Sequence, residues 1–348
     1  MSAMPLPPRI VSPGDVACTL SVVVPVHDEE AVLAKFHRRL IAATDKVAGG
    51  IEILYVDDGS TDSTPCVLRQ LRALDGRVGI VRLSRNFGKE QAMSAGLREA
   101  RGSATVVIDA DLQDPPELIP AMLDAWRRGA DVVNMRRRDR AGESWLKRAT
   151  AYLFYRLMNR LSDVSIPVDT GDFRLLSRRA LDAVNSLPER NRIMKGLFAW
   201  IGFHQRTIEY DRDSRAAGSS KWRYWKLWNL ALEGITGFSV APLKVATYVG
   251  FLTALSAFVY AAFVFVKTLL LGDPVPGFPT LIVVISFLGG LQLMAIGVLG
   301  EYVGRLFVEA KNRPLYLIEE MHSPAQAPRT SWNRGVVESI ANESPVIR

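Results

Sequence analysis

Cysteine is scarce in this chain: Cys18 and Cys66 are the only two among 348 residues. Two thiols cannot form the disulfide framework that holds small secreted domains together, so we expect the protein to work in a reducing compartment. Residues 1–15 lack the long apolar run of a secretory signal peptide, and their proline content predicts a disordered lead-in. Both features argue against a secreted protein.

A nucleic-acid-binding module is also missing. The chain has 43 Lys and Arg against 36 Asp and Glu, which gives a formal net charge of +7. The basic residues lack the interleaved aromatic residues of a recognised DNA or RNA module, and they concentrate beside two long uncharged segments. Anionic lipid explains this distribution better, because each well-placed Lys or Arg contributes about 1 kcal/mol at a membrane surface. We therefore expect a membrane partner and no nucleic acid.

Charge is absent from residues 245–266 and 274–300, runs of 22 and 27 residues. A helix needs about 20 residues to cross the hydrocarbon core of a bilayer, so the two runs predict two transmembrane helices. Basic residues flank the pair at its outer ends, whereas the connecting segment 267–279 carries one Lys and one Asp. The positive-inside rule then places both termini in the cytoplasm, with a short outer hairpin.

Two stretches combine basic and aromatic side chains. Residues 219–229 contain three Trp, one Tyr and three cations, and residues 145–160 have a similar mixture. Amphipathic rings of this kind suit the headgroup level of a membrane, so both stretches are interpreted as surface helices on or near the bilayer. An ordinary amphipathic helix packed on the domain is the alternative for both.

Four short apolar runs are each followed by helix-compatible sequence, which predicts an α/β domain with a mostly parallel sheet. Open sheets of this class bind ligands beyond the carboxyl ends of their strands. Asp109 and Asp111 follow the last of the four runs, and Gln113 and Asp114 come next. Such oxygen ligands suit Mg²⁺ or Mn²⁺ shared with substrate phosphates, although acidic residues also commonly terminate strands in loops. The predicted strands are 20–26, 51–56, 79–83 and 104–108.

The loops after these strands carry a resemblance. Their order and spacing are similar to those of the family 2 glycosyltransferases with a GT-A fold, and more narrowly to the polyprenyl-phosphate glycosyltransferases. Within that group, segments 188–202, 217–222 and 238–242 most resemble the bactoprenol glucosyltransferases, with the dolichyl-phosphate mannose synthases as further relatives. The likeness covers roughly residues 18 to 320 and is specific because four motifs agree. These motifs are VVVPVHDEE, VDDGSTDST, LSRNFGK and DADLQDPPE.

The resemblance implies roles for the acidic loops. It places a Mg²⁺ or Mn²⁺ ion at Asp111, with Asp109 and Gln113 beside it, where the cation would stabilise the departing nucleoside diphosphate. Asp172, in the TGDFRL segment, is expected to join Asp109 and Asp111 as a catalytic residue that orients an arginine or the donor sugar. The nucleotide-sugar contacts implied by the resemblance are Pro25, His27, Glu29, Asp57 and Lys89. His27-Asp28 replaces the Tyr-Asn pair that relatives often carry, so these two positions depart from the family pattern.

The acceptor is expected to be polyprenyl (undecaprenyl) phosphate. A lipid monophosphate has a second pKa of about 6 and is already an anionic nucleophile at neutral pH, so it needs cations and no general base. The resemblance matches Arg137 and Arg140 best to the acceptor-phosphate arginines, and further cations precede the first uncharged run at Arg212, Arg215 and Lys221. A purely topological role for these cations is the alternative. A single displacement on UDP-glucose would invert the anomeric configuration, since no second carboxylate is assigned as a nucleophile.

Other functions fit less well. A processive polysaccharide synthase would carry a Q-x-x-R-W segment and usually more spans, whereas this chain has QRTIEY at 205–210. A flippase or channel would need ionisable residues inside the spans, and neither uncharged run contains a charged residue. A non-catalytic nucleotide-binding regulator would have lost part of the acidic set, whereas this chain keeps all of it. The sugar itself stays open: GDP-mannose, a UDP-N-acetylhexosamine or a modified pentose would use the same skeleton.

The expected organisation is a multi-pass protein of the bacterial inner membrane, with its catalytic domain in the cytoplasm, supplying a lipid-linked sugar for cell-envelope glycosylation. Relatives in the bactoprenol branch imply a homotetramer. The predicted segments are a lead-in (1–17), a GT-A catalytic domain (18–215), juxtamembrane interfacial helices (216–243), a first span (244–271), an outer hairpin (272–279), a second span (280–302) and a cytosolic tail (303–348).

Overall fold

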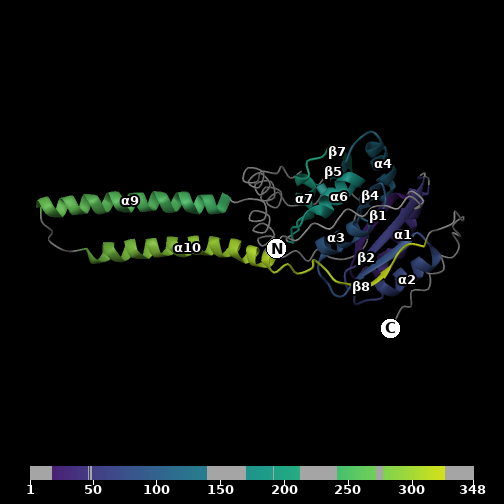
Figure 1. Ribbon diagram of the computed structural model, residues 1–348, viewed down its shortest axis with the longest axis horizontal. Coiled ribbons are helices and arrows are strands. Elements are labelled where there is room, and N and C mark those ends of the chain that lie inside the picture. The colour runs from purple at the N-terminus through teal and green to yellow at the C-terminus, as the bar shows by residue number, and fades with distance from the viewer. Residues whose placement is uncertain are drawn as a thin grey trace. The chain divides into compact units, whose positions relative to one another are not determined.

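The computed structural model describes residues 18–45, 47, 49–138, 170–190, 192–211, 241–271 and 277–325 (Figure 1). The chain forms two compact units, which are described separately. The first comprises residues 1–149, 166–221 and 314–348, and it holds an eight-stranded sheet with the order β7-β5-β6-β4-β1-β2-β3-β8. Its strands are β1 (Cys18–Val26), β2 (Gly50–Asp57), β3 (Val78–Leu83), β4 (Ala104–Val107), β5 (Val132–Arg137), β6 (Thr170–Ser177), β7 (Gln205–Tyr210) and β8 (Ile318–His322).

The centre of the sheet is the part that the sequence predicts. Strands β4, β1, β2 and β3 are neighbours and run parallel, and each begins and ends within a few residues of its predicted range. Antiparallel pairs then add β6 to β4 and β8 to β3, while β5 pairs antiparallel with β6 and parallel with β7. The α/β fold with a mostly parallel sheet is confirmed.

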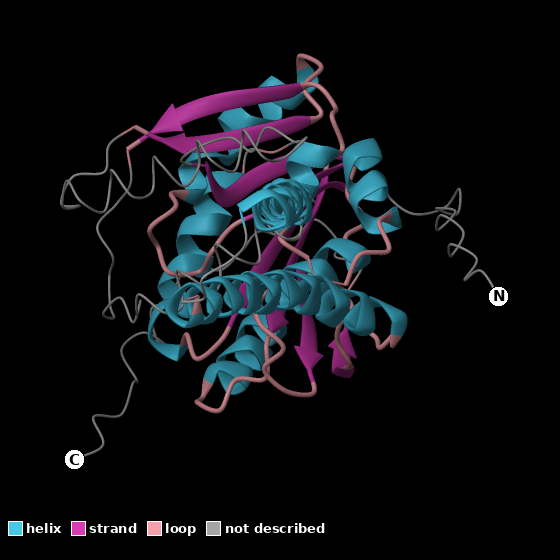
Figure 2. Ribbon diagram, turned by 90° about the vertical axis from the view of Figure 1, so that its left-hand side faces the viewer, coloured by secondary structure: helices cyan, strands magenta, loops and turns pink. Residues whose placement is uncertain are grey.

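Helices cover both faces of the sheet (Figure 2). Alternate residues of β1 separate the two layers: Val22 and Val24 join the core cluster that contains Phe36 of α1, whereas Val23 faces α3. At Gly96 of α3 an added Cβ would lie 2.4 Å from a Val23 methyl group, so this helix packs closely only because glycine stands there. The helices among the described residues of this unit are α1 (Glu30–Thr44), α2 (Thr64–Leu74), α3 (Lys89–Glu99), η1 (Pro116–Leu118), α4 (Ile119–Arg127), α6 (Arg178–Ser186) and α7 (Met194–Trp200).

The second unit contains a hairpin of two long helices, α9 (Ala241–Leu271) and α10 (Phe278–Ala310). Phe287–Ala310 is long and apolar enough to cross a membrane, and Val245–Tyr260 is a shorter apolar stretch. Large apolar side chains on both helices are exposed, as at Phe258 (72%). Among the described residues, length and composition therefore support one span, and the second predicted span stays a prediction.

Several predicted segments fall outside the described residues. These are the lead-in 1–17, the basic aromatic stretch 145–160, nearly all of the juxtamembrane segment 216–243 and most of the outer hairpin. Part of the predicted cytosolic tail lies within the described residues. Residues 318–322 form β8 and complete one edge of the sheet.

Candidate functional site

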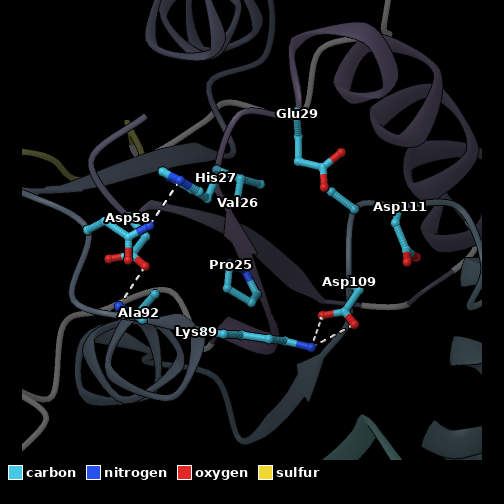
Figure 3. A pocket seen from close by; sticks show the side chains of 12 residues that line it. Pro25, Val26, His27, Glu29, Asp58, Lys89, Ala92, Asp109 and Asp111 are labelled. Carbon is cyan, nitrogen blue, oxygen red and sulfur yellow. Dashed lines mark hydrogen bonds and ion pairs between the residues drawn. The ribbon is translucent and has the colours of Figure 1, made fainter. Parts of the chain in front are cut away.

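A cavity of about 390 Å³ opens at the carboxyl ends of β1 and β4. Parallel strands bring the loops that follow them to one edge of the sheet, which is why residues far apart in sequence meet here. Figure 3 shows Glu29 and Asp111 on one side of this cavity, and Lys89 reaching across toward Asp109. The predicted residues that line it are Pro25, His27, Glu29, Lys89, Asp109 and Asp111.

The loop after β2 forms the wall of the cavity through Asp58, one residue after the predicted Asp57. The Asp58 carboxylate lines the cavity and accepts hydrogen bonds from the backbone N–H groups of Phe87 (2.7 Å) and Gly88 (2.9 Å). Gly59 follows with φ +65°, and a Cβ at that position would lie 2.4 Å from the Arg85 backbone, so the turn requires glycine. Asp58 was not predicted as a site residue, although it belongs to the same motif as Asp57.

Asp57 is fully buried behind this wall and is not among the residues that line the cavity. One of its carboxylate oxygens accepts the backbone N–H of Ser60 at 2.9 Å. The other oxygen is 3.4 Å from Arg82 Nε and, within the described residues, has no hydrogen-bond partner. Asp57 therefore keeps one carboxylate oxygen that accepts no hydrogen bond within the described part of the chain.

His27 is placed by the loop that follows β3. Its Nε2 lies 2.9 Å from the side-chain nitrogen of Asn86, and both residues line the cavity. Asp28, next to it, has a positive φ of 54° and accepts the backbone N–H of Thr61 at 2.8 Å. The departure from the family pattern at His27-Asp28 thus ties the first loop to the loops after β2 and β3.

Lys89 is the electrostatic centre of the site. Its Nζ lies 2.7 Å from the Asp109 carboxylate and 2.6 Å from Asp172 Oδ2. Burial lowers the pKa of Lys89, but the two carboxylates outweigh it and hold that pKa above its ordinary value. Burial raises the pKa of Asp109, whereas Lys89 and Lys195 overcome burial at Asp172 and hold its pKa below the usual range. The predicted catalytic residues Asp109 and Asp172 are therefore brought together by a lysine.

The D-x-D loop presents two carboxylates to the cavity. Asp109 and Asp111 both line it, and Asp111 accepts the backbone N–H of Gln113 at 3.1 Å. Gln113 is itself only 8% exposed and does not line the cavity. Among the described residues no three His, Cys, Asp or Glu side chains form a metal cluster of their own. The donor set fits a cation such as Mg²⁺, which commonly takes one or two carboxylates and completes its shell with substrate phosphates and water.

Arg136 and Arg137 belong to strand β5. β5 continues because Arg136 pairs across to Glu209 of β7, and Arg137 is in register with Tyr210. The Arg137 guanidinium lies 4.0 Å from Asp114, which is 1% exposed and also accepts the Tyr210 hydroxyl. Arg137 is thus held in an internal charged network beside the D-x-D loop. The other predicted acceptor cations, Arg140, Arg212, Arg215 and Lys221, lie outside the described residues.

Three charged residues near Asp172 were not predicted. Lys195, on α7, lies 4.0 Å from Asp172 Oδ1. Glu90, on α3, accepts the backbone N–H of Met194 at 3.1 Å, and burial together with Asp172 raises the pKa of Glu90 to about 7. Arg174 is buried, donates to the Gly171 carbonyl and lies over the Phe198 ring, and burial lowers its pKa to about 10. Lys195 falls in segment 188–202, and the resemblance of that segment to the bactoprenol glucosyltransferases was the sign in the sequence that this region belongs to the site.

The chain is similar to known proteins over most of its length. Residues 21–184 match the model of glycosyl transferase family 2, and residues 241–306 match the GtrB C-terminal hairpin. A bactoprenol glucosyl transferase from an SfII prophage of Shigella flexneri is 47% identical over 303 residues, covering 87% of this chain and 98% of the relative. An uncharacterized glycosyltransferase of Synechocystis is 49% identical over 314 residues, covering 90% and 99%.

The chain therefore belongs to glycosyl transferase family 2. Within that family its relatives include a prophage bactoprenol glucosyl transferase homolog of Escherichia coli, 45% identical over 302 residues that cover 87% of this chain and 99% of the relative. The resemblance stated from the motifs is confirmed, and the chain is identified as a glycosyltransferase of the group that contains the bactoprenol glucosyl transferases.

Proposed function

We propose that this protein transfers glucose from UDP-glucose to polyprenyl phosphate, with inversion at the anomeric carbon. The observation that carries the proposal is the cavity at the carboxyl edge of the sheet, where Asp109, Asp111 and Lys89 meet. Relatives named bactoprenol glucosyl transferase, at 45–47% identity over most of the chain, support the sugar and the acceptor.

A divalent cation, Mg²⁺ or Mn²⁺, is proposed for this cavity, where it would neutralise charge developing on the departing UDP. Asp109 and Asp111 would hold it, while Gln113 supports the loop through its bond to Asp111. The nucleotide is proposed to lie against Pro25, His27 and Glu29. The buried oxygen of Asp57 that accepts no hydrogen bond among the described residues would accept an N–H from the base.

Asp172 suits a phosphate acceptor better than a hydroxyl acceptor. A hydroxyl group must lose its proton to a base, and an efficient base has a pKa near the working pH. The pKa of Asp172 is instead held below its usual range by Lys89 and Lys195, so this carboxylate is a weak base. A lipid phosphate, already anionic at neutral pH, removes the need for one.

The acceptor phosphate is proposed to contact Arg137 and Arg140, with Arg212, Arg215 and Lys221 drawing the lipid headgroup toward the site. For Arg137 the structure adds a constraint: its guanidinium interacts with Tyr210 and lies 4.0 Å from Asp114. We infer that Arg137 shapes the acceptor side of the site as well as meeting the phosphate.

The helical hairpin is proposed to anchor the protein in the bacterial inner membrane by two spans. Its helices have 31 and 33 residues, about 46 and 50 Å at 1.5 Å per residue, and a helix crosses the apolar core with about 20 residues. The distribution of Lys and Arg favours a cytoplasmic catalytic unit and cytoplasmic termini. A homotetramer is proposed from the resemblance alone.

The decisive experiment is transfer by the purified full-length protein in vesicles containing undecaprenyl phosphate, with a panel of labelled nucleotide sugars. We expect UDP-glucose to give labelled lipid, unphosphorylated undecaprenol to be inert and a chelator to stop the reaction. Asp111→Ala should abolish transfer without unfolding, whereas the control Asp124→Ala, at an exposed residue of α4, should behave as wild type. Equal transfer to undecaprenol, or full activity of Asp111→Ala, would overturn the proposal.

A further inference from the structure

Four side chains of alternating charge form a row that begins in the donor cavity. Asp109 and Lys89 line the cavity, Asp172 lies 2.6 Å beyond Lys89, and Lys195 lies 4.0 Å beyond Asp172. Neither Asp172 nor Lys195 is among the residues that line the cavity. The row therefore leads from the donor side of the site to a cation outside the cavity.

The two lysines of this row differ in what they can still bind. Lys89 is 2.7 Å and 2.6 Å from two carboxylates, so its ammonium is occupied. Lys195 is 4.0 Å from Asp172 Oδ1, too far for a hydrogen bond, and its side chain is 38% exposed. Within the described part of the chain Lys195 donates no hydrogen bond to protein, so its N–H groups are available to an anion.

Glu90 fixes the position of this second lysine. It follows Lys89 on α3, and its carboxylate accepts the backbone N–H of Met194, the residue before Lys195. The first turn of α3 thus carries Lys89 itself, and through the hydrogen bond from Met194 to Glu90 it also fixes the backbone next to Lys195. Arg137 approaches the same place from β5, since its guanidinium would lie 3.3 Å from a Cβ at Gly171, next to Asp172.

We infer that Lys195 binds the phosphate of the acceptor lipid and that Glu90 is the positioning residue that holds Lys195 in place. This inference rests on the proposed function and deepens it. An acceptor phosphate must approach a sugar that is bonded to a second phosphate, and two anions meet only where cations separate or screen them. Lys89 serves the donor side of Asp172, and Lys195 stands on the other side.

The test is steady-state transfer by the full-length protein in vesicles, with UDP-glucose and undecaprenyl phosphate varied separately. Lys195→Met should raise KM for undecaprenyl phosphate by about ten-fold and change KM for UDP-glucose less than two-fold, because only the acceptor loses a charge-assisted contact. Lys195→Arg should recover most of the loss. The matched control is Lys35→Met, an exposed lysine of α1 that should have wild-type constants.

Glu90 is tested through its dependence on Lys195. Glu90→Leu should also raise the acceptor KM, Glu90→Gln should largely restore it, and Glu90→Leu should add little in a Lys195→Met background, since both act through one contact. If Glu90 has only a structural role, the effects of Glu90→Leu and Lys195→Met on the kinetic constants should multiply in the double variant. Glu90→Leu alone would then lower the thermal midpoint without a selective change in the acceptor KM.

The outcomes separate the inference from the function on which it rests. If the wild-type protein transfers glucose and Lys195→Met leaves the acceptor KM unchanged, the inference is overturned and the proposed function stands. A rise in KM for UDP-glucose instead assigns Lys195 to the donor diphosphate and also overturns it. Wild-type protein that does not glucosylate undecaprenyl phosphate overturns the proposed function.

Discussion

Lys89→Met should make the protein bind Mn²⁺ more tightly. In the structure the Lys89 ammonium occupies Asp109, one of the two carboxylates proposed to hold the metal, at 2.7 Å. A cation entering the cavity must therefore compete with a lysine that is already there. Removing this lysine leaves the Asp109 carboxylate free for the metal.

The size of the effect follows from exposure. The Lys89 and Asp109 side chains are 42% and 23% exposed, so solvent screens their pair and it is worth about 1 kcal/mol. Released to the metal, 1 kcal/mol corresponds to about five-fold in affinity. Burial and nearby Asp172 already raise the pKa of Asp109, and the loss of Lys89 would raise it further, so protons compete with Mn²⁺ more strongly as the pH falls. The measurement therefore belongs on the alkaline side of neutrality, at about pH 8, where competition from protons is weaker.

Free Mn²⁺ can be measured by electron paramagnetic resonance during titration of the protein in the presence of UDP. Lys89→Met should show a dissociation constant about five-fold lower than wild type, and Mn²⁺ should raise its thermal midpoint by more. Lys35→Met again serves as the control. Equal or weaker Mn²⁺ binding by Lys89→Met would refute the competition between lysine and metal.

Three further predictions follow from the site and the hairpin. Arg137→Ala should lower the free energy of unfolding by about 3 kcal/mol, because buried Asp114 loses the cation beside it. Arg137→Lys should restore this stability more fully than it restores the KM for the acceptor. An unchanged denaturation midpoint of Arg137→Ala would contradict the prediction. Because the pKa of Glu90 is raised in the folded state, its contribution to the free energy of unfolding is complete below about pH 4.5 and is lost as pH rises through about 7. Melting curves measured across this window should show Glu90→Gln gaining stability relative to wild type as pH rises. Parallel pH dependences of the two proteins would contradict the prediction. A tag at Pro276 should be labelled from outside intact cells and a reporter after Arg348 only from inside; a cytoplasmic tag at Pro276 would exclude two spans.

The parts of the fold that the sequence predicts are those decided by local pattern. The β-branched runs that became β1 to β4 are bounded by turn residues, and a repeated strand–helix order implies parallel neighbours. Strand β8 could not be found this way, because IEEMH has no apolar alternation and its role depends on pairing with the distant β3. Strand β6 differs: Asp172-Phe173-Arg174-Leu175 alternates polar and apolar residues as a strand does, but this local pattern does not indicate the antiparallel pairing with β4 and β5.

The same limit applies to the site. Asp109, Asp111 and Lys89 were expected together because parallel strands deliver their loops to one edge. The link from Lys89 through Asp172 to Lys195 spans elements on separate parts of the chain, and no local spacing encodes it. The end of β5 is also hidden from the sequence, because consecutive arginines suggest a solvated loop, whereas Glu209 provides the cross-strand partner for Arg136.

The position of β8 determines the order in which the protein can be assembled. The last strand of the sheet is synthesised after both helices of the hairpin, so β3 has an unpaired edge until the ribosome has passed His322. Open strand edges pair readily with other chains, which makes the nascent protein vulnerable to aggregation during this interval. A chain ending before Pro314 would keep every cavity residue and still carry this open edge. Completion of the catalytic unit is thus coupled, during translation, to prior synthesis of the hairpin.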